Sequence, residues 1–428
     1  MRILLTGASG FIGKHVRAAL LAEGHHVLCA TRSPPNGASA RLDWIHADFT
    51  KDTDKSDWLA RLREVDAVIN AVGIFWEQGD QRFATLHTDS PCALFAACAE
   101  SDSVKLVIQI SALGADEGAD TPYHLSKKAA DDCLAGLPPR PSLRRFIVQP
   151  SLVYGKDGVS ARMFKTLASM PFSVRFGKGA QLVQPVHVDD VAAAIAALVR
   201  QVDVGDDTRS ARRIALVGPA PLPFTDYLAA LRQAMGLGRL RLLSLPGGLA
   251  SLAARLRIGW LDPEALRMLE RGNSADHADT ARLLGRPARP VASFIDDPAA
   301  ERLQAKLGWL LPMLRVSIAL VWVATAIVSA GLYPVEQSYQ LLDRTGVPAA
   351  LAPLMLYGAA GLDLLLGIAT LMLARRRWLW LAQLGLIGFY SIVIAFRLPE
   401  FLLHPYGPLT KNLPMLAAIW LLYELEEK

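Results

Sequence analysis

The chain has 428 residues, more than one ordinary domain accommodates, which predicts two or three folding units. Hydrophobic residues make up 52% and charged residues 20% of the chain, a balance that excludes a disordered protein. The charge is unevenly spread, since residues 312–428 contain only 8 basic and 7 acidic side chains. The net charge of +5 has no basic cluster behind it, so we expect no nucleic-acid partner.

The cysteines and the first residues indicate a reducing compartment. The chain has 4 cysteines and no CxxC pair, so we expect neither a metal site nor a disulfide framework. These cysteines are Cys29, Cys92, Cys98 and Cys133. Met1 and Arg2 run directly into a strand-like segment, which indicates no signal peptide and favours a cytoplasmic front domain.

Up to about residue 155, short apolar segments alternate with helical patterns. This rhythm predicts the α/β class, as a Rossmann-type doubly wound parallel sheet. The expected strands are 3–6, 27–30, 67–71, 106–111 and 146–149, with helices at 11–23 and 91–100. The strand pattern returns at 182–188 and 214–217. The less regular stretches, mainly 156–181 and 219–305, predict a small substrate lobe that completes a domain of residues 1–305.

Within this lobe, residues 239–241 and 252–260 combine arginines with apolar side chains. The pattern is typical of a basic amphipathic helix on a lipid surface or of an ordinary helix with one solvated face.

The last quarter predicts membrane-spanning helices. Residues 316–335 and 378–396 are uncharged runs of 20 and 19 residues, near the ~20 that span hydrocarbon. A third run, 345–374, is broken by one carboxylate before its end, and a fourth, 412–423, is shorter. We therefore expect an all-α four-helix transmembrane domain over residues 312–428.

Several side chains of this domain invite specific expectations. Asp363 is an intramembrane carboxylate, which marks either a proton or quinone site or a buried structural group, with Arg397 and Lys411 as candidate partners. The side chains expected at the membrane interface are Trp322, Tyr357, Trp378 and Trp380. Two short groups of basic residues flank the first and third expected spans and belong on the cytoplasmic side by the positive-inside rule: Arg302, Lys306 and Arg315, and Arg375, Arg376 and Arg377.

The first expected strand leads into the sequence TGASGFIG, which then opens a helix. This is the context of a dinucleotide-binding turn. Gly7 permits the tight turn, Gly10 lets the backbone approach a pyrophosphate, and Gly13 allows close packing of helix on strand. The predicted cofactor contacts here are Thr6, Gly7, Ser9, Gly10, Phe11, Ile12 and Gly13.

The GxxGxxG spacing resembles the extended and atypical short-chain dehydrogenase/reductase superfamily over residues 1 to about 300. At the end of the second strand Arg32 stands where an acid would favour NAD, and a guanidinium pairs well with a 2′-phosphate. The prediction is NADP(H) in preference to NAD(H). The resemblance further implies an adenine contact at Asp48. It also implies a cofactor-contacting loop of Asn70, Ala71, Val72 and Gly73, although Asn70 could simply cap a turn.

The predicted catalytic residues are Ser111, at the end of the fifth strand, and Tyr123 and Lys127 in a YxxxK block. The i, i+4 spacing places Tyr123 and Lys127 on one helix face, where the ammonium is expected to lower the phenol pKa from ~10. The resemblance implies that Tyr123 exchanges a proton with a substrate oxygen that Ser111 also bonds. Lys127 would reach the nicotinamide ribose, and the cofactor would transfer the hydride.

Two more blocks resemble superfamily motifs. Residues 148–155 resemble the stretch around the nicotinamide end, which implies cofactor contacts at Pro150 and Val153. Gln149 replaces an arginine that sugar-nucleotide epimerases often have there. In residues 185–191 we expect an aspartate to cap the following helix and His187 and Asp189 to be structural.

The region from Ser111 through the YxxxK block resembles the atypical branch that includes the nucleotide-binding accessory subunit of respiratory complex I. The last helices, with the block at 411–414, resemble the DoxX-like membrane domain, a fusion known in bacterial membrane proteins. We therefore expect a multi-pass protein of the bacterial inner (cytoplasmic) membrane, with the nucleotide domain and both termini in the cytoplasm.

The combination predicts an NAD(P)-dependent oxidoreductase in contact with the lipid bilayer. Its substrate would be a small molecule with a carbonyl or alcohol, lipophilic or a quinone. One alternative is a non-catalytic NADPH-binding scaffold or sensor with a partner in a membrane complex. The other is a sugar-nucleotide epimerase or dehydratase.

Overall fold

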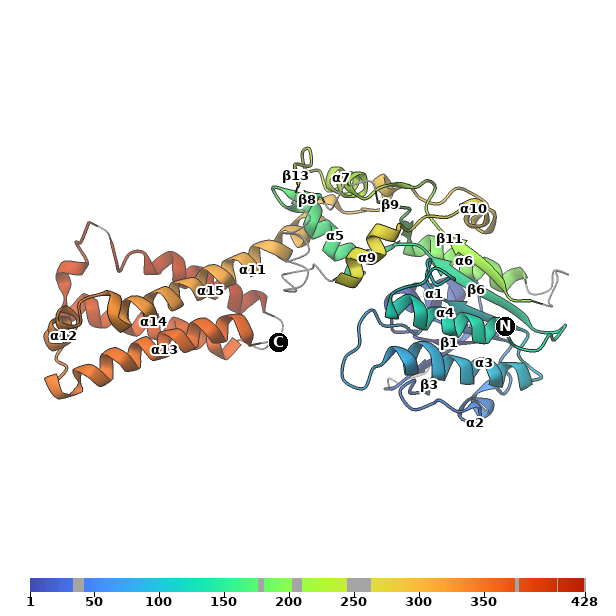
Figure 1. The fold of residues 1–428 in the computed structure, drawn as a ribbon, viewed down its shortest axis with the longest axis horizontal. Helices are drawn as coiled ribbons and strands as arrows, with labels where there is room; N and C mark the ends of the chain where they lie inside the picture. Colours follow the sequence, from blue (N-terminus) through green and yellow to red (C-terminus); the bar gives the residue numbers. More distant parts are fainter. Residues whose placement is uncertain are drawn as a thin grey trace. The chain divides into compact units, whose positions relative to one another are not determined.

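A computed structural model describes residues 1–33, 42–175, 181–201, 210–244, 263–373, 377–405 and 407–426. The chain divides into two compact units, Met1–Ala305 and Lys306–Lys428. Figure 1 shows the first unit from blue to yellow and the second in orange and red.

The first unit is built on a seven-stranded sheet in the order β11-β6-β5-β4-β1-β2-β3, in which every pairing is parallel. Its strands are β1 (Arg2–Thr6), β2 (His26–Thr31), β3 (Leu42–His46), β4 (Ala67–Asn70), β5 (Leu106–Ile110), β6 (Arg144–Pro150) and β11 (Arg212–Leu216). The doubly wound parallel sheet is confirmed. The strand order reverses between β1 and β4, and ligands of such sheets bind at the carboxyl ends of the strands at this point.

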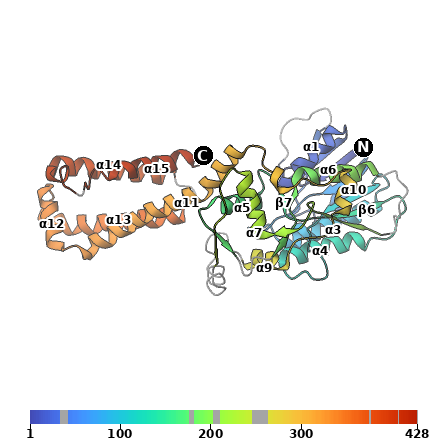
Figure 2. The same cartoon turned by 90° about the horizontal axis from the view of Figure 1, so that it is seen from above.

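Helices cover both faces of the sheet (Figure 2). One face packs against α1 (Phe11–Ala22) and α6 (Val188–Arg200), the other against α3 (Ser90–Glu100) and α4 (Pro122–Ala135), with α2 (Lys55–Leu59) and the short η1 (Ala60–Leu62) beside α3. Alternate residues of β1 enter opposite cores: Ile3 and Leu5 lie in one, Leu4 in the other. Burial on both faces explains why these strands are uniformly apolar.

The lobe contains small sheets and helices around its own core. Its elements are β7 (Val153–Tyr154), α5 (Val159–Ser169), β8 (Ser173–Arg175), β9 (Leu182–Val183), β10 (Val186–His187), β12 (Leu222–Pro223), α7 (Phe224–Ala234), β13 (Leu242–Ser244), α9 (Pro263–Arg271), α10 (Ala278–Leu284) and η4 (Val291–Ser293). The core of this lobe includes Phe224, Tyr227 and Phe294.

One expectation for the lobe was wrong, and a second was wrong for the part of it that the structure describes. The stretch 182–188 does not enter the main sheet, because it is divided into β9 and β10, which pair with β12 and β7 in separate two-stranded sheets. Pro185 lies at the division, and a proline cannot donate to a central strand. Residues 239–241 are not helical but lead into β13, and the stretch 252–260 lies outside the described residues.

The second unit is helical, as predicted. Its elements are α11 (Pro298–Ile327), which begins in the first unit, η5 (Val328–Leu332), α12 (Val335–Arg344), η6 (Ala349–Leu351), α13 (Ala352–Met372), α14 (Arg377–Arg397), η7 (Pro399–Phe401) and α15 (Asn412–Leu425). Within the described residues, three helical stretches are long and apolar enough to cross a membrane: Pro298–Leu332, Ala349–Met372 and Arg377–Arg397. The fourth expected span, α15, has only 14 residues. Helix α12 was missed because its sequence is too polar for a span.

The prediction that four aromatic side chains lie at the membrane interface was wrong for two of them. Trp322 and Trp380 are buried in the core of the second unit, whereas Trp378 and Tyr357 are exposed. Trp322 Nε1 donates to Gln383 Oε1 at 2.8 Å, because a buried indole N–H requires an acceptor. Asp363 is also buried, and among the described residues its Oδ1 has no hydrogen-bond partner, so the structure shows neither Arg397 nor Lys411 bonded to that atom.

The expectation of no disulfide was wrong. Cys92 of α3 and Cys133 of α4 are bonded across a sequence separation of 41 residues. The spacing of the cysteines gives no hint of this pair, because it depends on the packing of α3 beside α4. Cys29 and Cys98 are free and buried.

Candidate nucleotide-binding and active site

The turn after β1 accepts glycine alone at two positions. Gly7 has a φ of +67°, and a Cβ there would lie 2.6 Å from the carbonyl carbon of Ala71. A Cβ on Gly13 would lie 2.0 Å from the Gly7 oxygen. Helix α1 starts after Gly10, so no side chain caps its N-terminus. Its first turn also has no acidic residue. Its first N–H groups therefore suit a phosphate anion, as the fit of a dinucleotide requires.

The stretch expected at the nicotinamide end lies against this turn. A Cβ on Gly155 would come within 2.7 Å of the Phe11 ring, so a larger residue would push the two apart. Pro150 ends β6 and is buried, and Val153 in β7 is half-buried. Of the remaining predicted contacts, Ser9 is exposed, Ile12 is half-buried on α1, and Ala71 and Val72 follow β4.

The side chains of Thr6 and Asn70 are hydrogen-bonded to each other and to a neighbouring strand. Both residues are fully buried. The Thr6 hydroxyl donates to Asn70 Oδ1, and Asn70 Nδ2 donates to Gln109 Oε1 at 2.7 Å. Asn70 Oδ1 also accepts from Val72 N at 3.3 Å, so Asn70 does cap the turn after β4. These side chains join β1, β4 and β5, which leaves the backbone as the part that can meet a nucleotide.

Arg32, just after β2, and Asp48, just after β3, lie close enough for their charges to interact. Asp48 Oδ1 accepts from Thr50 N and Oγ1 at 3.0 and 2.8 Å. Burial raises the pKa of Asp48, but these hydrogen bonds and the charges of Lys51 and Arg32 outweigh it, so the pKa lies below its usual range. Arg32 itself is exposed. An exposed guanidinium at this place fits a phosphate ligand.

Helix α4 places Tyr123 and Lys127 in its first two turns. The Thr121 side chain caps it by accepting from His124 N. Lys127 is buried, and its Nζ donates to the carbonyl oxygens of Val72 at 3.1 Å and Ile110 at 3.2 Å. Burial lowers the pKa of Lys127 to about 8, against the opposing charge of Asp131. The ammonium thus ties α4 to the chain that follows β4 and to the end of β5.

The phenol of Tyr123 lies in an aromatic cluster. Phe75 stacks on its ring with centroids 5.5 Å apart, and Phe83 and His87 approach it edge-on. Burial, with a contribution from the Asp131 charge, raises the pKa of Tyr123 above its ordinary value. The expected lowering of this pKa by Lys127 was therefore wrong. The Lys127 ammonium is engaged by two carbonyl oxygens, and the surrounding rings disfavour a phenolate.

Ser111 is bonded to a residue that the sequence did not single out. Its Oγ donates to Asp131 Oδ2 at 2.6 Å, and Gln149 Nε2 donates to the same oxygen at 3.3 Å. Burial raises the pKa of Asp131 to about 6. The signal was present in the sequence, because Tyr123, Lys127 and Asp131 form one i, i+4, i+8 row on a helix.

His87, in the helical turn η2 (Ala84–Asp89), was also missed. Its Nε2 accepts from Ile74 N at 2.9 Å, so its Nδ1 has the proton and faces Ser126 Oγ at 2.8 Å. Burial lowers the pKa of His87 to about 2, which keeps the ring neutral. The ring holds the loop after β4 against α4, and no local motif predicts such a contact.

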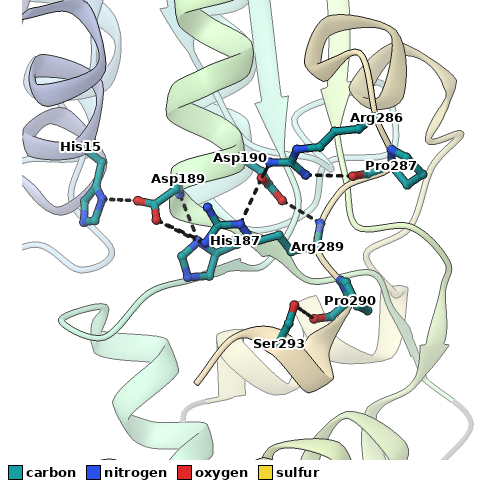
Figure 3. A network of polar contacts seen from close by, with 9 residues as sticks. All are labelled: His15, His187, Asp189, Asp190, Arg286, Pro287, Arg289, Pro290 and Ser293. Carbon is teal, nitrogen blue, oxygen red and sulfur yellow. Dashed lines mark hydrogen bonds and ion pairs between the residues drawn. The ribbon is translucent and has the colours of Figure 1, made fainter. Parts of the chain in front are cut away.

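A second polar network joins α6 to α1 and to residues 286–289 (Figure 3). His187 caps α6, because its ring accepts from Asp189 N at 3.3 Å. The expected aspartate cap was therefore wrong. Asp189 instead meets His15 Nδ1 at 2.7 Å, and Asp190 accepts from Arg286 Nη2 at 2.6 Å. The described part of the chain contains no group of three His, Cys, Asp or Glu residues that could hold a metal ion.

Comparisons with known proteins find similarities for both units. Residues 3–212 match the model of the NAD dependent epimerase/dehydratase family, and residues 319–420 match that of the DoxX-like family. An epimerase family protein of Mycobacterium leprae is 28% identical over 290 residues, which cover 63% of this chain and 87% of that protein.

Two other relatives share fewer residues. The ceramide reductase of Caulobacter vibrioides is 26% identical over 200 residues, 46% of this chain and 61% of that protein. The mitochondrial NADH dehydrogenase [ubiquinone] 1 alpha subcomplex subunit 9 of Arabidopsis thaliana is 26% identical over 261 residues, 59% of this chain and 62% of that protein.

Solved structures share the fold of the first unit. A nucleoside-diphosphate-sugar epimerase from Staphylococcus aureus superposes with a TM-score of 0.54 at 17% identity, covering 69% of this chain and all of that one. UDP-glucuronic acid 4-epimerase from Bacillus cereus, in complex with NAD, gives 0.51 at 20% identity, covering 72% and 100%. The family matches therefore give the chain an NAD-dependent, epimerase/short-chain dehydrogenase/reductase-like domain at residues 3–212 and a C-terminal DoxX-like domain at residues 319–420.

Proposed function

We propose that this protein is a membrane-anchored NAD(P)-dependent oxidoreductase that acts on the carbonyl or alcohol of a lipophilic substrate. Residues 1–305 would perform the chemistry and residues 312–428 would hold the protein in the bilayer. The observation that supports this most directly is the position of Lys127. Its ammonium bonds the backbone at Val72 and Ile110, beside Gly73 and one residue before Ser111, on the same helix face as Tyr123.

Each side chain has a role in this chemistry. The nicotinamide cofactor, when bound, supplies or accepts the hydride. Tyr123 Oη gives its proton to the substrate oxygen during reduction, and Ser111 bonds that oxygen. Lys127 holds positive charge beside Tyr123 and would reach the ribose of the nicotinamide. Phe75 covers the Tyr123 ring and would have to yield to the substrate.

We assign the cofactor as NADP(H) in preference to NAD(H). The exposed Arg32 follows β2, where a 2′-phosphate would lie, and its charge acts on Asp48, the candidate adenine contact. The other contacts to the cofactor would come from three places. These are the glycine turn after β1, the loop of residues 70–73, and the stretch that contains Pro150 and Val153.

The lipophilic substrate is supported by two observations. Phe75 and Trp76, in the loop beside Tyr123, leave 60% and 58% of their surfaces exposed. Two large aromatic side chains exposed next to each other offer apolar surface that a lipophilic ligand could cover. One relative is named a ceramide reductase, which is an enzyme named for a lipid substrate.

The proposed location is the inner membrane, multi-pass, with the nucleotide domain and both termini in the cytoplasm. The Cys92–Cys133 disulfide bears on this, because disulfides are uncommon in reducing compartments. Labelling of free thiols in intact cells would find these two cysteines reduced if the domain is cytoplasmic. Protection from labelling that is lost only after chemical reduction would place the domain outside.

The scaffold hypothesis remains as the second candidate, because the Tyr123 ring is covered and one relative is a subunit of a respiratory complex. A scaffold would retain one equivalent of cofactor that does not exchange. The epimerase hypothesis is weakened because Gln149 replaces the arginine that sugar-nucleotide epimerases often have at this position. Stabilisation of the protein by nucleoside diphosphate sugars in a thermal-shift screen would support that hypothesis.

The deciding experiment uses the full chain purified in detergent. NADPH oxidation is measured with long-chain ketones and quinones, for the wild type and for Tyr123→Phe. We expect turnover that falls by about 10²-fold to 10⁴-fold in the variant, with cofactor affinity unchanged. Absence of turnover with every such substrate, together with a locked cofactor, would contradict the oxidoreductase and favour the scaffold.

A further inference from the structure

Asp131 is a fully buried carboxylate one turn beyond Lys127 on α4. Its Oδ2 accepts two hydrogen bonds, from Ser111 Oγ at 2.6 Å and Gln149 Nε2 at 3.3 Å. Among the described residues its Oδ1 has no hydrogen-bond partner. An ionised carboxylate with one buried, unpaired oxygen is costly, so this arrangement favours a proton on Asp131.

The groups that face Asp131 have opposing effects on its pKa, because burial favours the neutral acid and nearby positive charges favour the carboxylate. Lys127 on the same helix and Arg213 on β11 favour the ionised form, while Gln149 on β6 is neutral. Neither cation is committed to Asp131, because Lys127 bonds two carbonyl oxygens and Arg213 Nη2 bonds Asp132 Oδ1 at 2.8 Å. The ionised Asp131 in turn opposes a phenolate at Tyr123. The balance leaves Asp131 with a pKa of about 6, so its charge changes close to neutral pH.

A serine hydroxyl has one hydrogen to donate. When Asp131 is ionised, Ser111 gives that hydrogen to Oδ2 and can only accept a hydrogen bond from a substrate. When Oδ2 is protonated, the acid donates to Ser111 Oγ and releases the serine hydrogen. We propose that Asp131 is a positioning residue that makes Ser111 a donor to the substrate oxygen when protonated and an acceptor when ionised.

This inference rests on the proposed oxidoreductase function. In reduction, the hydride that NADPH would supply from a C–H bond, leaving NADP⁺, bonds the carbonyl carbon. The C=O π electrons move to oxygen, and that oxygen takes the proton from the Tyr123 O–H bond. A hydrogen bond donated by Ser111 stabilises the negative charge that develops there. Reduction is therefore faster with protonated Asp131 and slows as pH rises through its titration, by up to about 10²-fold, the effect of losing one such donor.

The first test is the pH profile of NADPH-dependent reduction by the full chain between pH 5 and 7, a range below the Lys127 pKa of about 8. Asp131→Asn removes the titrating carboxyl group, so we expect the rate of this variant to stay constant over the pH range in which the wild type slows. Asp102→Asn is the matched control, because it removes the same charge from an exposed position before β5 and should keep the wild-type profile. A wild-type decline that persists in Asp131→Asn overturns the proposal.

Ser111→Ala provides a second variant in case Asp131→Asn folds poorly. Because Asp131 acts through Ser111, this variant should be slow and independent of pH over the same range. A decline that remains in Ser111→Ala would show that another group titrates, and would also overturn the proposal.

A third measurement needs no substrate and so separates this inference from the proposed function. The folded-state pKa of Asp131 is above its unfolded value, so ionisation destabilises the folded wild type as pH rises from about 4 to beyond 6. The thermal midpoint of Asp131→Asn should rise relative to that of the wild type over this range and then level off. A difference that does not change with pH contradicts the buried, titrating Asp131, even if no substrate is ever turned over.

Discussion

The ring of Phe75 stacks on the ring of Tyr123, with centroids 5.5 Å apart and planes inclined by 19°. Phe75 thus has one face on the candidate acid while most of its surface meets solvent. A substrate that reaches the phenol must displace or contact this ring. The contact links the chemistry of Tyr123 to the choice of substrate.

The Phe75→Ala variant should therefore lose its preference for long apolar substrates. Loss of an aromatic contact of about 1.4 kcal/mol lowers kcat/KM about tenfold for a long-chain ketone and leaves a short-chain ketone nearly unaffected. The measurement is kcat/KM across a series of chain lengths. Leu59→Ala on α2, another exposed apolar position, is the control. An equal loss at every chain length would show that Phe75 only supports the fold.

Arg32→Ala should weaken NADPH binding more than NADH binding. A hydrogen-bonded pair with a charged group contributes about 1.5–3 kcal/mol, so we expect the Kd for NADPH to rise about tenfold to a hundredfold. Fluorescence titration with both cofactors gives the comparison, and Arg63→Ala removes an exposed arginine elsewhere as the control. If the affinities for NADPH and NADH fall equally, Arg32 does not bind the 2′-phosphate.

Lys165 and Glu301 form a buried ion pair that fixes the beginning of α11 to α5. Removing either charge leaves the other buried without a partner, so Lys165→Met and Glu301→Gln should each lower the free energy of unfolding by about 3–5 kcal/mol. The double replacement by Met and Leu should cost much less. Thermal unfolding of the full chain measures this. The exposed pair Lys55 and Glu100 is the control, where changes below about 1 kcal/mol are expected.

His87 should make stability depend on pH below about 6.5. Its folded-state pKa is lowered to about 2, so its contribution is complete above the unfolded value of about 6.5 and is lost as pH falls. The wild type should lose about 1.4 kcal/mol per pH unit relative to His87→Gln, or roughly 2 kcal/mol between pH 6.5 and 5. Denaturant titrations at several pH values give this difference. His46→Gln, at an exposed position, should show no such trend.

Much of the fold follows from local pattern. The alternation of apolar strands with helices determines the parallel sheet, because strands buried on both faces must be uniformly apolar. The glycine turn is equally local, since Gly7 and Gly13 occupy positions where a Cβ would strike the backbone. The apolar runs of the last quarter likewise determine helices that could cross a membrane, although the fourth is shorter than expected.

The tertiary structure decided what depends on residues distant in sequence. It joined Cys92 to Cys133, placed Trp322 in the interior of the helical unit, and removed residues 182–188 from the main sheet. Long-range packing also determines whether a group is desolvated and which partners it finds, and these set its pKa. The sequence by itself therefore determined which residue types stand at the ends of the strands. Only the tertiary structure decided that Ser111 is bonded to Asp131 and that the Tyr123 ring is covered, because burial and partners arise when separate elements pack together.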